Sequence, residues 1–125
     1  MHVVDTCGWI EWLTDGTLAD DFAPFLCDAE NLLVPTLVQF ELYKWCLREL
    51  GEAEALDVIA VTQGCTVRVL DTSLALSAAE LSLHYKLAMA DAIVYATVLA
   101  GHCQLLTSDA HFEGLPGVRY WPKKP

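Results

Sequence analysis

Four short apolar segments, each too short to form a helix, recur along this 125-residue chain between longer segments with helical spacing. Their apolar residues do not alternate with polar ones, which is typical of strands buried on both faces of a parallel sheet. The segments are residues 3–4, 32–34, 67–70 and 103–106, and residues 118–120 are expected to form a last edge strand. Such alternation of strands and helices indicates βαβ units. We therefore predict a three-layer α/β/α sandwich with a mostly parallel central sheet.

The segments between these strands carry apolar residues at the spacing of amphipathic helices. They predict helices over about residues 9–13, 18–28, 36–50, 53–61, 73–85 and 87–101. Thr36 is expected to be the N-cap of the third of these helices, and residues 71–73 are expected to cap the fifth. The last segment holds one charged residue, Asp91, among fifteen. A helix with almost no polar face must be buried nearly all round.

Length and composition limit the class of protein further. The chain is 54% hydrophobic and 19% charged, so it is not a disordered protein, and its length suits a single domain over residues 1–125. Seven Lys and Arg against 17 Asp and Glu give a net charge of −10, which excludes a basic protein that coats nucleic acid. No apolar run reaches the length of a membrane span, we expect no signal peptide, and the five cysteines lack CxxC spacing. We expect a cytoplasmic protein with reduced thiols.

Four acidic residues occupy positions where a surface role does not account for them. Asp5 ends the first strand and Asp109 follows the fourth, while Glu41 lies on the apolar face of its helix and Asp91 lies in the first turn of the apolar helix. In a parallel sheet the carboxyl ends of the strands share one edge, where ligands bind. The four carboxylates are therefore expected to converge at that edge.

Each acid also has a simpler explanation, which the sequence leaves open. The two acids at strand ends are residue types that cap a following helix or turn. Lys44 is one turn from Glu41 and is able to pair with it, and Asp91 is placed to interact with a helix dipole.

Converging carboxylates repel one another, which raises their pKa values unless a divalent cation is present. Oxygen ligands suit Mg²⁺ or Mn²⁺, and no histidine has the sequence spacing of a zinc site. His111 is the only histidine expected near the acids, and we expect it to be solvent-facing or structural. Carboxylate-bound Mg²⁺ supports phosphoryl chemistry, and the sequence has no GxxxxGK[ST] loop for nucleotide binding. This favours metal-dependent phosphodiester hydrolysis, with phosphomonoester hydrolysis as the rival.

The motifs around the four acids, taken in order, resemble those of the PIN domain family. The resemblance covers essentially the whole chain. The size of the chain is similar to that of stand-alone VapC toxins of VapBC toxin–antitoxin pairs. The matching segments are residues 3–6, the helix that follows residues 34–36, and residues 87–93, 106–112 and 115–118. The sequence departs from the pattern at Cys7, where a serine is more usual, and at Ser108, where a basic residue is common.

This resemblance implies a Mg²⁺- or Mn²⁺-dependent endoribonuclease, the toxin of a type II pair, that a cognate antitoxin inhibits. Asp5 and Asp91 are implied as the main metal ligands, with Glu41 binding directly or through water. Asp109 is implied to hold a second ion or to orient the attacking water. The hydroxyls implied to support these acids are those of Thr6 and Thr107.

The remaining predictions concern partners. Lys44 and Arg48 are one turn apart on the Glu41 helix, so they either contact the RNA backbone beside the site or are solvated surface charges. The acidic surface suits an antitoxin segment that carries Arg or Lys. Some aromatic residues are expected to exceed what the core needs and to line a groove for an antitoxin helix or a homodimer face: Trp9, Trp12, Phe40, Tyr43 and Trp45.

Two other functions remain open. A haloacid-dehalogenase-like phosphatase also begins with an aspartate at a strand end, but it needs a second aspartate two residues later, where Cys7 stands. A non-catalytic PIN-like binding module shares the fold but does not need all four acids.

Overall fold

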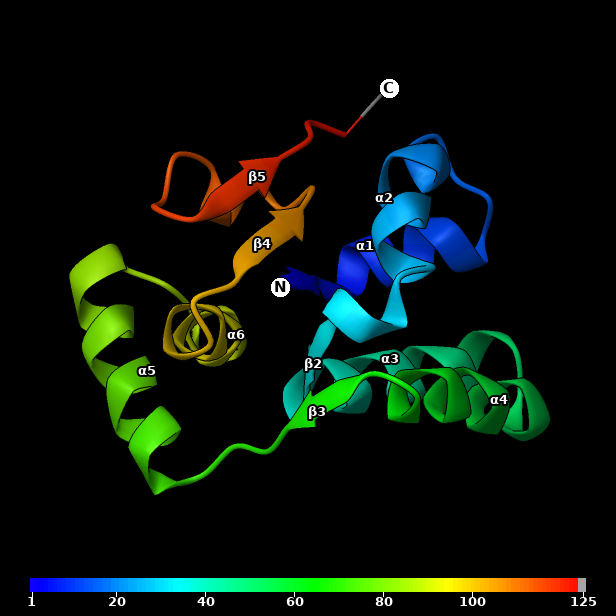
Figure 1. Ribbon diagram of the computed structural model, residues 1–125, viewed down its shortest axis with the longest axis horizontal. Coiled ribbons are helices and arrows are strands. Elements are labelled where there is room, and N and C mark those ends of the chain that lie inside the picture. Colours follow the sequence, from blue (N-terminus) through cyan, green and yellow to red (C-terminus); the bar gives the residue numbers. More distant parts are fainter. Residues whose placement is uncertain (124–125) are drawn as a thin grey trace.

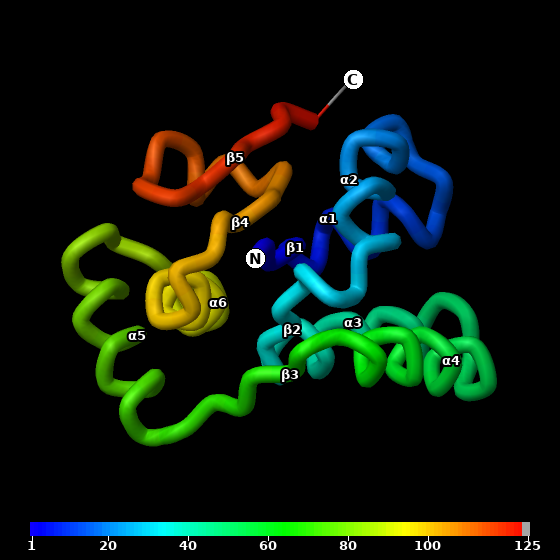
Figure 2. Tube along the Cα trace, viewed as in Figure 1, coloured from blue at the N-terminus to red at the C-terminus, as the bar shows by residue number. Residues whose placement is uncertain are grey.

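The computed structural model describes residues 1–123, and within them all strand pairs are parallel. The strands are β1 (His2–Val4), β2 (Leu33–Pro35), β3 (Thr66–Arg68), β4 (Gln104–Thr107) and β5 (Val118–Tyr120). β1, β4 and β5 form one hydrogen-bonded sheet, β2 and β3 form another, and a parallel bridge from His2 to Leu32 joins the two. The spatial order is therefore β3-β2-β1-β4-β5, with β1 at the centre (Figure 2). The order reverses between β1 and β4, which is where α/β sheets bind ligands.

Six α-helices connect and cover these strands in the described part of the chain. They are α1 (Thr6–Leu13), α2 (Ala19–Leu26), α3 (Thr36–Glu49), α4 (Glu52–Gln63), α5 (Thr72–Tyr85) and α6 (Met89–Ala100). Two 3₁₀ turns, η1 (Ala29–Asn31) and η2 (Ala110–Phe112), complete the connections. α5 and α6 lie on one side of the strands and α1 and α2 on the other, with the α3–α4 pair beside β2 and β3 (Figure 1). This arrangement confirms the predicted α/β/α sandwich.

The core lies between these layers, and the apolar strand segments supply its centre. Val3, Val4, Leu105 and Leu106 are at most 1% exposed, because each central strand is covered on both faces. α6 is buried along most of its length, as its apolar sequence predicts, and the Tyr95 hydroxyl donates a 2.6 Å hydrogen bond to the carbonyl of Pro116. None of the helices within residues 1–123 combines the length and apolar character needed to cross a bilayer.

The predicted capping residue of α3 is wrong, whereas that of α5 is confirmed. Thr36 is the first residue of α3, and its hydroxyl accepts a 3.3 Å hydrogen bond from the backbone N–H of Leu70 instead of capping its own helix. The third strand also ends earlier than predicted, at Arg68, so that Leu70 belongs to the loop. Asp71 caps α5 by accepting a 2.9 Å hydrogen bond from the N–H of Leu74.

Candidate active site

The ends of β1 and β4 place two of the predicted acids side by side. Val4 pairs with Leu106 in the parallel register, and the N–H of Asp5 extends this ladder by donating to the Leu106 carbonyl at 3.0 Å. Asp5 is also the N-cap of α1, and Asp109 is the N-cap of η2. Both acids therefore do cap the following turn, and both lie at the edge where the strand order reverses.

Gly8 lets α1 pack close to β1, which brings the residues after Asp5 into the site. A Cβ atom at this position would lie 2.6 Å from Cγ1 of Val4 and 2.9 Å from the ring of Phe22. Contacts this short require the neighbours to shift, so a larger residue would push α1 away from the strand.

Asp5 is the most buried of the four acids, with only 7% of its surface exposed. Its Oδ1 accepts a hydrogen bond from the N–H of Thr6 at 2.9 Å, and its Oδ2 accepts one from the hydroxyl of Thr107 at 2.8 Å. Burial raises the pKa of Asp5 to about 6; the two hydrogen bonds oppose this shift, and the nearby carboxylates of Asp91 and Glu41 add to it. The site therefore concentrates negative charge around a buried carboxylate.

The hydroxyl of Thr107 connects two acids that are far apart in the sequence. It donates to Asp5 and accepts a 2.9 Å hydrogen bond from the N–H of Asp109. The hydroxyl of Thr6 plays a similar part on the other side, donating to Oε1 of Glu41 at 2.8 Å and so linking α1 to α3. Each of the two threonines named from the sequence is thus in contact with the predicted acids.

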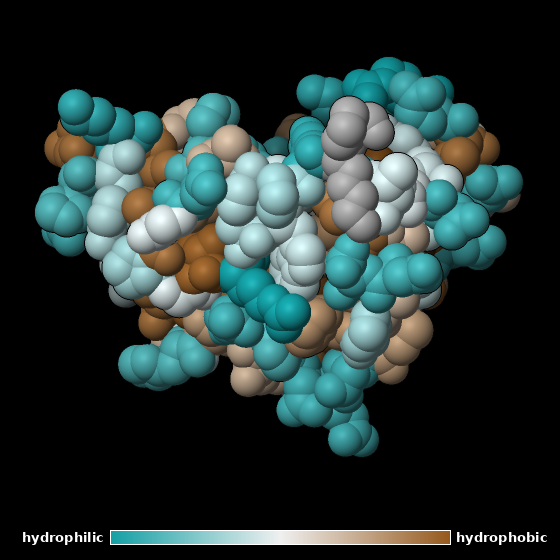
Figure 3. All heavy atoms as spheres, turned by 90° about the horizontal axis from the view of Figure 1, so that it is seen from above, coloured by the Kyte–Doolittle hydropathy of each residue, from teal (hydrophilic) through white to brown (hydrophobic). Residues whose placement is uncertain are grey.

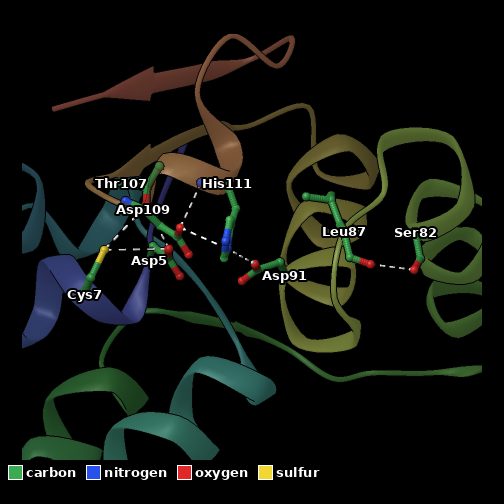
Figure 4. A network of polar contacts seen from close by, with 8 residues as sticks. All are labelled: Asp5, Cys7, Ser82, Leu87, Asp91, Thr107, Asp109 and His111. Carbon is green, nitrogen blue, oxygen red and sulfur yellow. Dashed lines mark hydrogen bonds and ion pairs between the residues drawn. The ribbon is translucent and has the colours of Figure 1, made fainter. Parts of the chain in front are cut away.

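Asp91, from the first turn of α6, faces Asp109 across a histidine ring (Figure 4). Nδ1 of His111 lies 3.3 Å from Oδ2 of Asp91 and 3.3 Å from Oδ1 of Asp109. Burial and the neighbouring Asp109 carboxylate raise the pKa of Asp91, while the hydrogen bond and charge of His111 act in the opposite direction. One ligand atom from each of the three residues lies within 4.8 Å of the other two, which is compact enough to hold a metal ion.

Sequence reasoning missed the place of His111 in this cluster. Its side chain is 73% exposed, as expected of a solvent-facing residue, and it lies near the acids as expected; the role that the sequence did not assign to it is that of a candidate metal ligand beside Asp91 and Asp109. The available signal was its position two residues after Asp109: the acid caps η2 by accepting a 2.9 Å hydrogen bond from the N–H of His111, and this turn directs the ring back towards the acids.

Cys7 is the second residue that the sequence did not assign to the site. Its thiol lies 3.7 Å from Oδ2 of Asp5 and 3.5 Å from the hydroxyl oxygen of Thr107, and it accepts a 3.5 Å hydrogen bond from the N–H of Ser108. Burial, followed by the charge of Asp5, raises the pKa of this thiol. Cys7 is therefore a neutral hydrogen-bonding group in the site rather than an activated nucleophile. Ser108 itself is buried.

Glu41 is half-buried, and its described contacts do not include the ion pair with Lys44 that would explain it as purely structural. The ammonium of Lys44 lies 6.0 Å over the ring of Phe40, and Arg48 pairs with its exposed neighbour Glu49. A shallow pocket of about 240 Å³ nevertheless brings Glu41 together with both basic side chains. Its lining residues are Ile10, Phe40, Glu41, Lys44, Trp45 and Arg48.

The chemistry of the donor atoms fits a divalent cation. Asp91, Asp109 and His111 offer two carboxylates and one imidazole nitrogen in a compact group, and Glu41 and Asp91 lie near enough to Asp5 to raise its pKa. The raised pKa values of Asp5 and Asp91 reflect burial first and then the neighbouring negative charge. A bound dication would remove this repulsion, because it favours the ionised form of each carboxyl group.

The comparison that decides the family is a family model that matches residues 2–118, and its description is the PIN domain. The chain belongs to the PIN domain family. Among curated proteins, none matches this sequence significantly.

Solved structures share the PIN fold across nearly the whole chain. A toxin–antitoxin complex from Klebsiella pneumoniae matches with a TM-score of 0.84 and 18% identity, covering 98% of this chain and 100% of that one. VapC20 from Mycobacterium tuberculosis, a toxin that cleaves the sarcin–ricin loop, matches with a TM-score of 0.78, 17% identity and coverage of 98% and 100%. DNA-bound VapBC from Salmonella typhimurium matches at 0.75, with 16% identity and coverage of 97% and 96%. At such identities these matches establish a common fold.

Proposed function

We propose that this PIN domain is a Mg²⁺- or Mn²⁺-dependent endoribonuclease and the toxin of a type II toxin–antitoxin pair. The observation that carries the proposal is the convergence of acids from four chain segments around the buried Asp5 carboxylate, whose pKa Asp91 and Glu41 both raise. Carboxylates that share a small space in this way are the usual ligands of Mg²⁺ and Mn²⁺ at phosphoryl-transfer sites. The RNA-cleaving VapC20 toxin, which has the same fold, supports the choice of substrate.

The roles that we propose for the acids are those that the resemblance to the PIN domain family implies. Asp5 and Asp91 hold the ion, Glu41 binds it directly or through water, and Asp109 holds a second ion or orients the attacking water. When bound, the ion polarises the scissile phosphate and lowers the pKa of water. Asp5, with a pKa of about 6, is mostly ionised at neutral pH and is ready to bind.

The threonine hydroxyls act on these acids as positioning groups. Thr107 fixes one oxygen of Asp5 and the backbone of Asp109 at once, and Thr6 fixes one oxygen of Glu41. Glu41 keeps its second oxygen for a cation, and Asp5, whose two oxygens each accept a hydrogen bond, keeps a second lone pair on each. Carboxylates that are already oriented in this way can bind a metal ion without a change in side-chain conformation.

The partner that we propose is a cognate antitoxin with a basic segment, together with a second copy of this chain. The net charge of −10 favours such a segment, and the solved complexes of the same fold include antitoxins. Exposed apolar side chains supply candidate contact surfaces: Phe40 on α3, and Leu76, Leu83 and Met89 on α5 and α6. Seen from above, brown apolar patches interrupt the hydrophilic surface, notably on the side of α5 (Figure 3). The mass of the purified chain in solution tests the homodimer.

The function is tested by incubating the purified chain, free of antitoxin, with total tRNA and ribosomal RNA. We expect discrete fragments with Mg²⁺ or Mn²⁺ and none with EDTA, because the acids need a cation to bind phosphate. A parallel reaction with p-nitrophenyl phosphate should give no product. Cleavage that persists in EDTA would contradict the metal dependence. No cleavage with either metal, together with a thermal unfolding temperature that Mn²⁺ leaves unchanged, would contradict the nuclease and favour a binding module.

Lys44 and Arg48 are proposed to contact the RNA backbone beside Glu41. Replacing both by alanine should weaken RNA binding and reduce the slope of log K against log [salt] by about 1.4, since each phosphate contact to a single strand contributes about 0.7. The measurement is RNA binding at several salt concentrations with Ca²⁺ in place of the active metal. A slope equal to that of the parent protein would mean that these side chains are solvated surface charges.

A further inference from the structure

We propose that Asp91, Asp109 and His111 form a mixed carboxylate–imidazole site in which His111 is a metal ligand and makes the site prefer Mn²⁺ or Zn²⁺ to Mg²⁺. The inference deepens the proposed function, because it concerns the metal preference of the same site. It stands on the positions of three ligand atoms and on the difference between nitrogen and oxygen as ligands.

The three ligand atoms lie close to the spacing that a single bound cation requires. Nδ1 of His111 is 3.3 Å from a carboxylate oxygen of Asp91 and 3.3 Å from one of Asp109. Ligands at right angles around one ion, each about 2.1 Å away, lie about 3 Å apart. The observed spacing therefore needs only a small adjustment to place one cation within reach of the nitrogen and both oxygens.

The turn η2 holds the ring of His111 in place. Asp109 accepts a hydrogen bond from the N–H of His111 through the same Oδ1 that faces the ring, so the short turn η2 fixes the acid and the histidine relative to each other. Nδ1 points at the two acids in Figure 4, which leaves Nε2 as the other ring nitrogen to carry a proton. Two of the three ligands are thus oriented by one local turn, and α6 supplies the third.

The three side chains are accessible from solvent. The Asp91 side chain is 21% exposed, that of Asp109 is 31% exposed and that of His111 is 73% exposed. A cation can therefore reach the cluster from solvent without any opening of the fold, and water can complete its coordination shell. Asp5, by contrast, is buried, and both of its oxygens accept hydrogen bonds.

The ligand type determines the preferred metal. Mg²⁺ favours oxygen and keeps several waters, so an imidazole adds little to its binding. For the first-row metals, affinity at nitrogen-containing sites increases from Mn²⁺ towards Zn²⁺, and imidazole is a common ligand of Zn²⁺. Adding His111 to two carboxylates should therefore shift the preference away from Mg²⁺ without excluding it.

The test measures metal binding itself, with each metal alone as the probe. The untagged protein and its His111→Ala variant are titrated calorimetrically with Mg²⁺, Mn²⁺ and Zn²⁺, with His84→Ala as the control because His84 is an exposed histidine on α5. We expect His111→Ala to lower Zn²⁺ affinity by at least about ten-fold and to leave Mg²⁺ affinity nearly unchanged. Pulsed EPR of the Mn²⁺-loaded protein should detect coupling to a nitrogen that disappears in His111→Ala and persists in His84→Ala.

Two results would overturn the proposal: equal changes in Mg²⁺ and Zn²⁺ affinity in His111→Ala, or Mn²⁺ without nitrogen coupling in the parent protein. Either would reduce His111 to an ion-pair partner of the acids. The results that would contradict the proposed nuclease function differ from those that would contradict the role of His111. A chain that binds Mn²⁺ with nitrogen coupling but cleaves no RNA keeps this site and loses the nuclease, whereas a metal-dependent nuclease without nitrogen coupling loses only the role of His111.

Discussion

Replacing Asp91 by asparagine should lower the rate of RNA cleavage by at least about 10³-fold, because the loss of a charged metal ligand removes several kcal/mol of transition-state stabilisation. Asparagine has the shape of aspartate, and Asp91 lies in the half-buried first turn of α6, so the helix should stay in place. The same variant should no longer inhibit the growth of cells that express it. Single-turnover cleavage and growth curves measure the two effects.

The matched control for this prediction is Asp57→Asn. Asp57 is an exposed aspartate on α4, away from the four acids, so its replacement removes the same charge without touching the site. This control should cleave RNA and inhibit growth like the parent. An Asp91→Asn protein that is folded and as active as Asp57→Asn would contradict the assignment of Asp91.

The stability of the metal-free protein should fall as the pH rises from about 4 to about 6, by up to about 3 kcal/mol from Asp5 alone. The pKa of Asp5 is about 6 in the folded protein, against an ordinary value of 3.8. Between these values the folded state binds the proton more tightly than the unfolded chain, so deprotonation costs folding free energy. The stabilisation is complete below the ordinary value and is lost once the pH passes the folded value.

Asp5→Asn isolates this contribution from other groups, such as Asp91, that also titrate. In EDTA, the variant should become more stable than the parent as the pH rises through this window, and urea unfolding at a series of pH values measures the difference. Mn²⁺ at about 1,000 times its dissociation constant should reverse the order at neutral pH, because binding to the folded parent stabilises it by about 4.1 kcal/mol, more than the burial of the Asp5 carboxylate costs. If the difference in unfolding free energy between the two proteins did not vary with pH, burial would not raise the pKa of the Asp5 carboxyl group.

The sequence predicts those features that depend on hydrophobic pattern and on parallel topology. The strands and the buried α6 follow from apolar segments with known periods, and the edge shared by Asp5 and Asp109 follows from the common direction of β1 and β4. The order of the strands does not follow in the same way, because the pairing of residues 2–4 with 104–106 depends on contacts across the whole fold.

The features that the sequence did not predict depend on local geometry at loop ends. The ring of His111 meets Asp91 only because a single 3₁₀ turn changes the direction of the chain after β4, and a one-residue difference in that turn would point the ring elsewhere. Thr36 fails as a predicted cap for a related reason: a residue 34 positions away, Leu70, takes its hydroxyl as a hydrogen-bond acceptor. Contacts between residues far apart in the sequence determine these hydrogen bonds, so a local sequence pattern does not predict them.

The hydrogen bond between Thr107 and Asp5 also determines when, during synthesis, the site can be completed. β1 is made first, but its neighbour β4 and the hydroxyl that orients Asp5 come from residues 104–107 of a 125-residue chain. A nascent or prematurely ended chain that stops before β4 holds Asp5 and Glu41 but lacks Thr107, Asp109 and His111. The topology thus delays the assembly of the acidic cluster until β4 has been synthesised, although Asp5 and Glu41 are made much earlier.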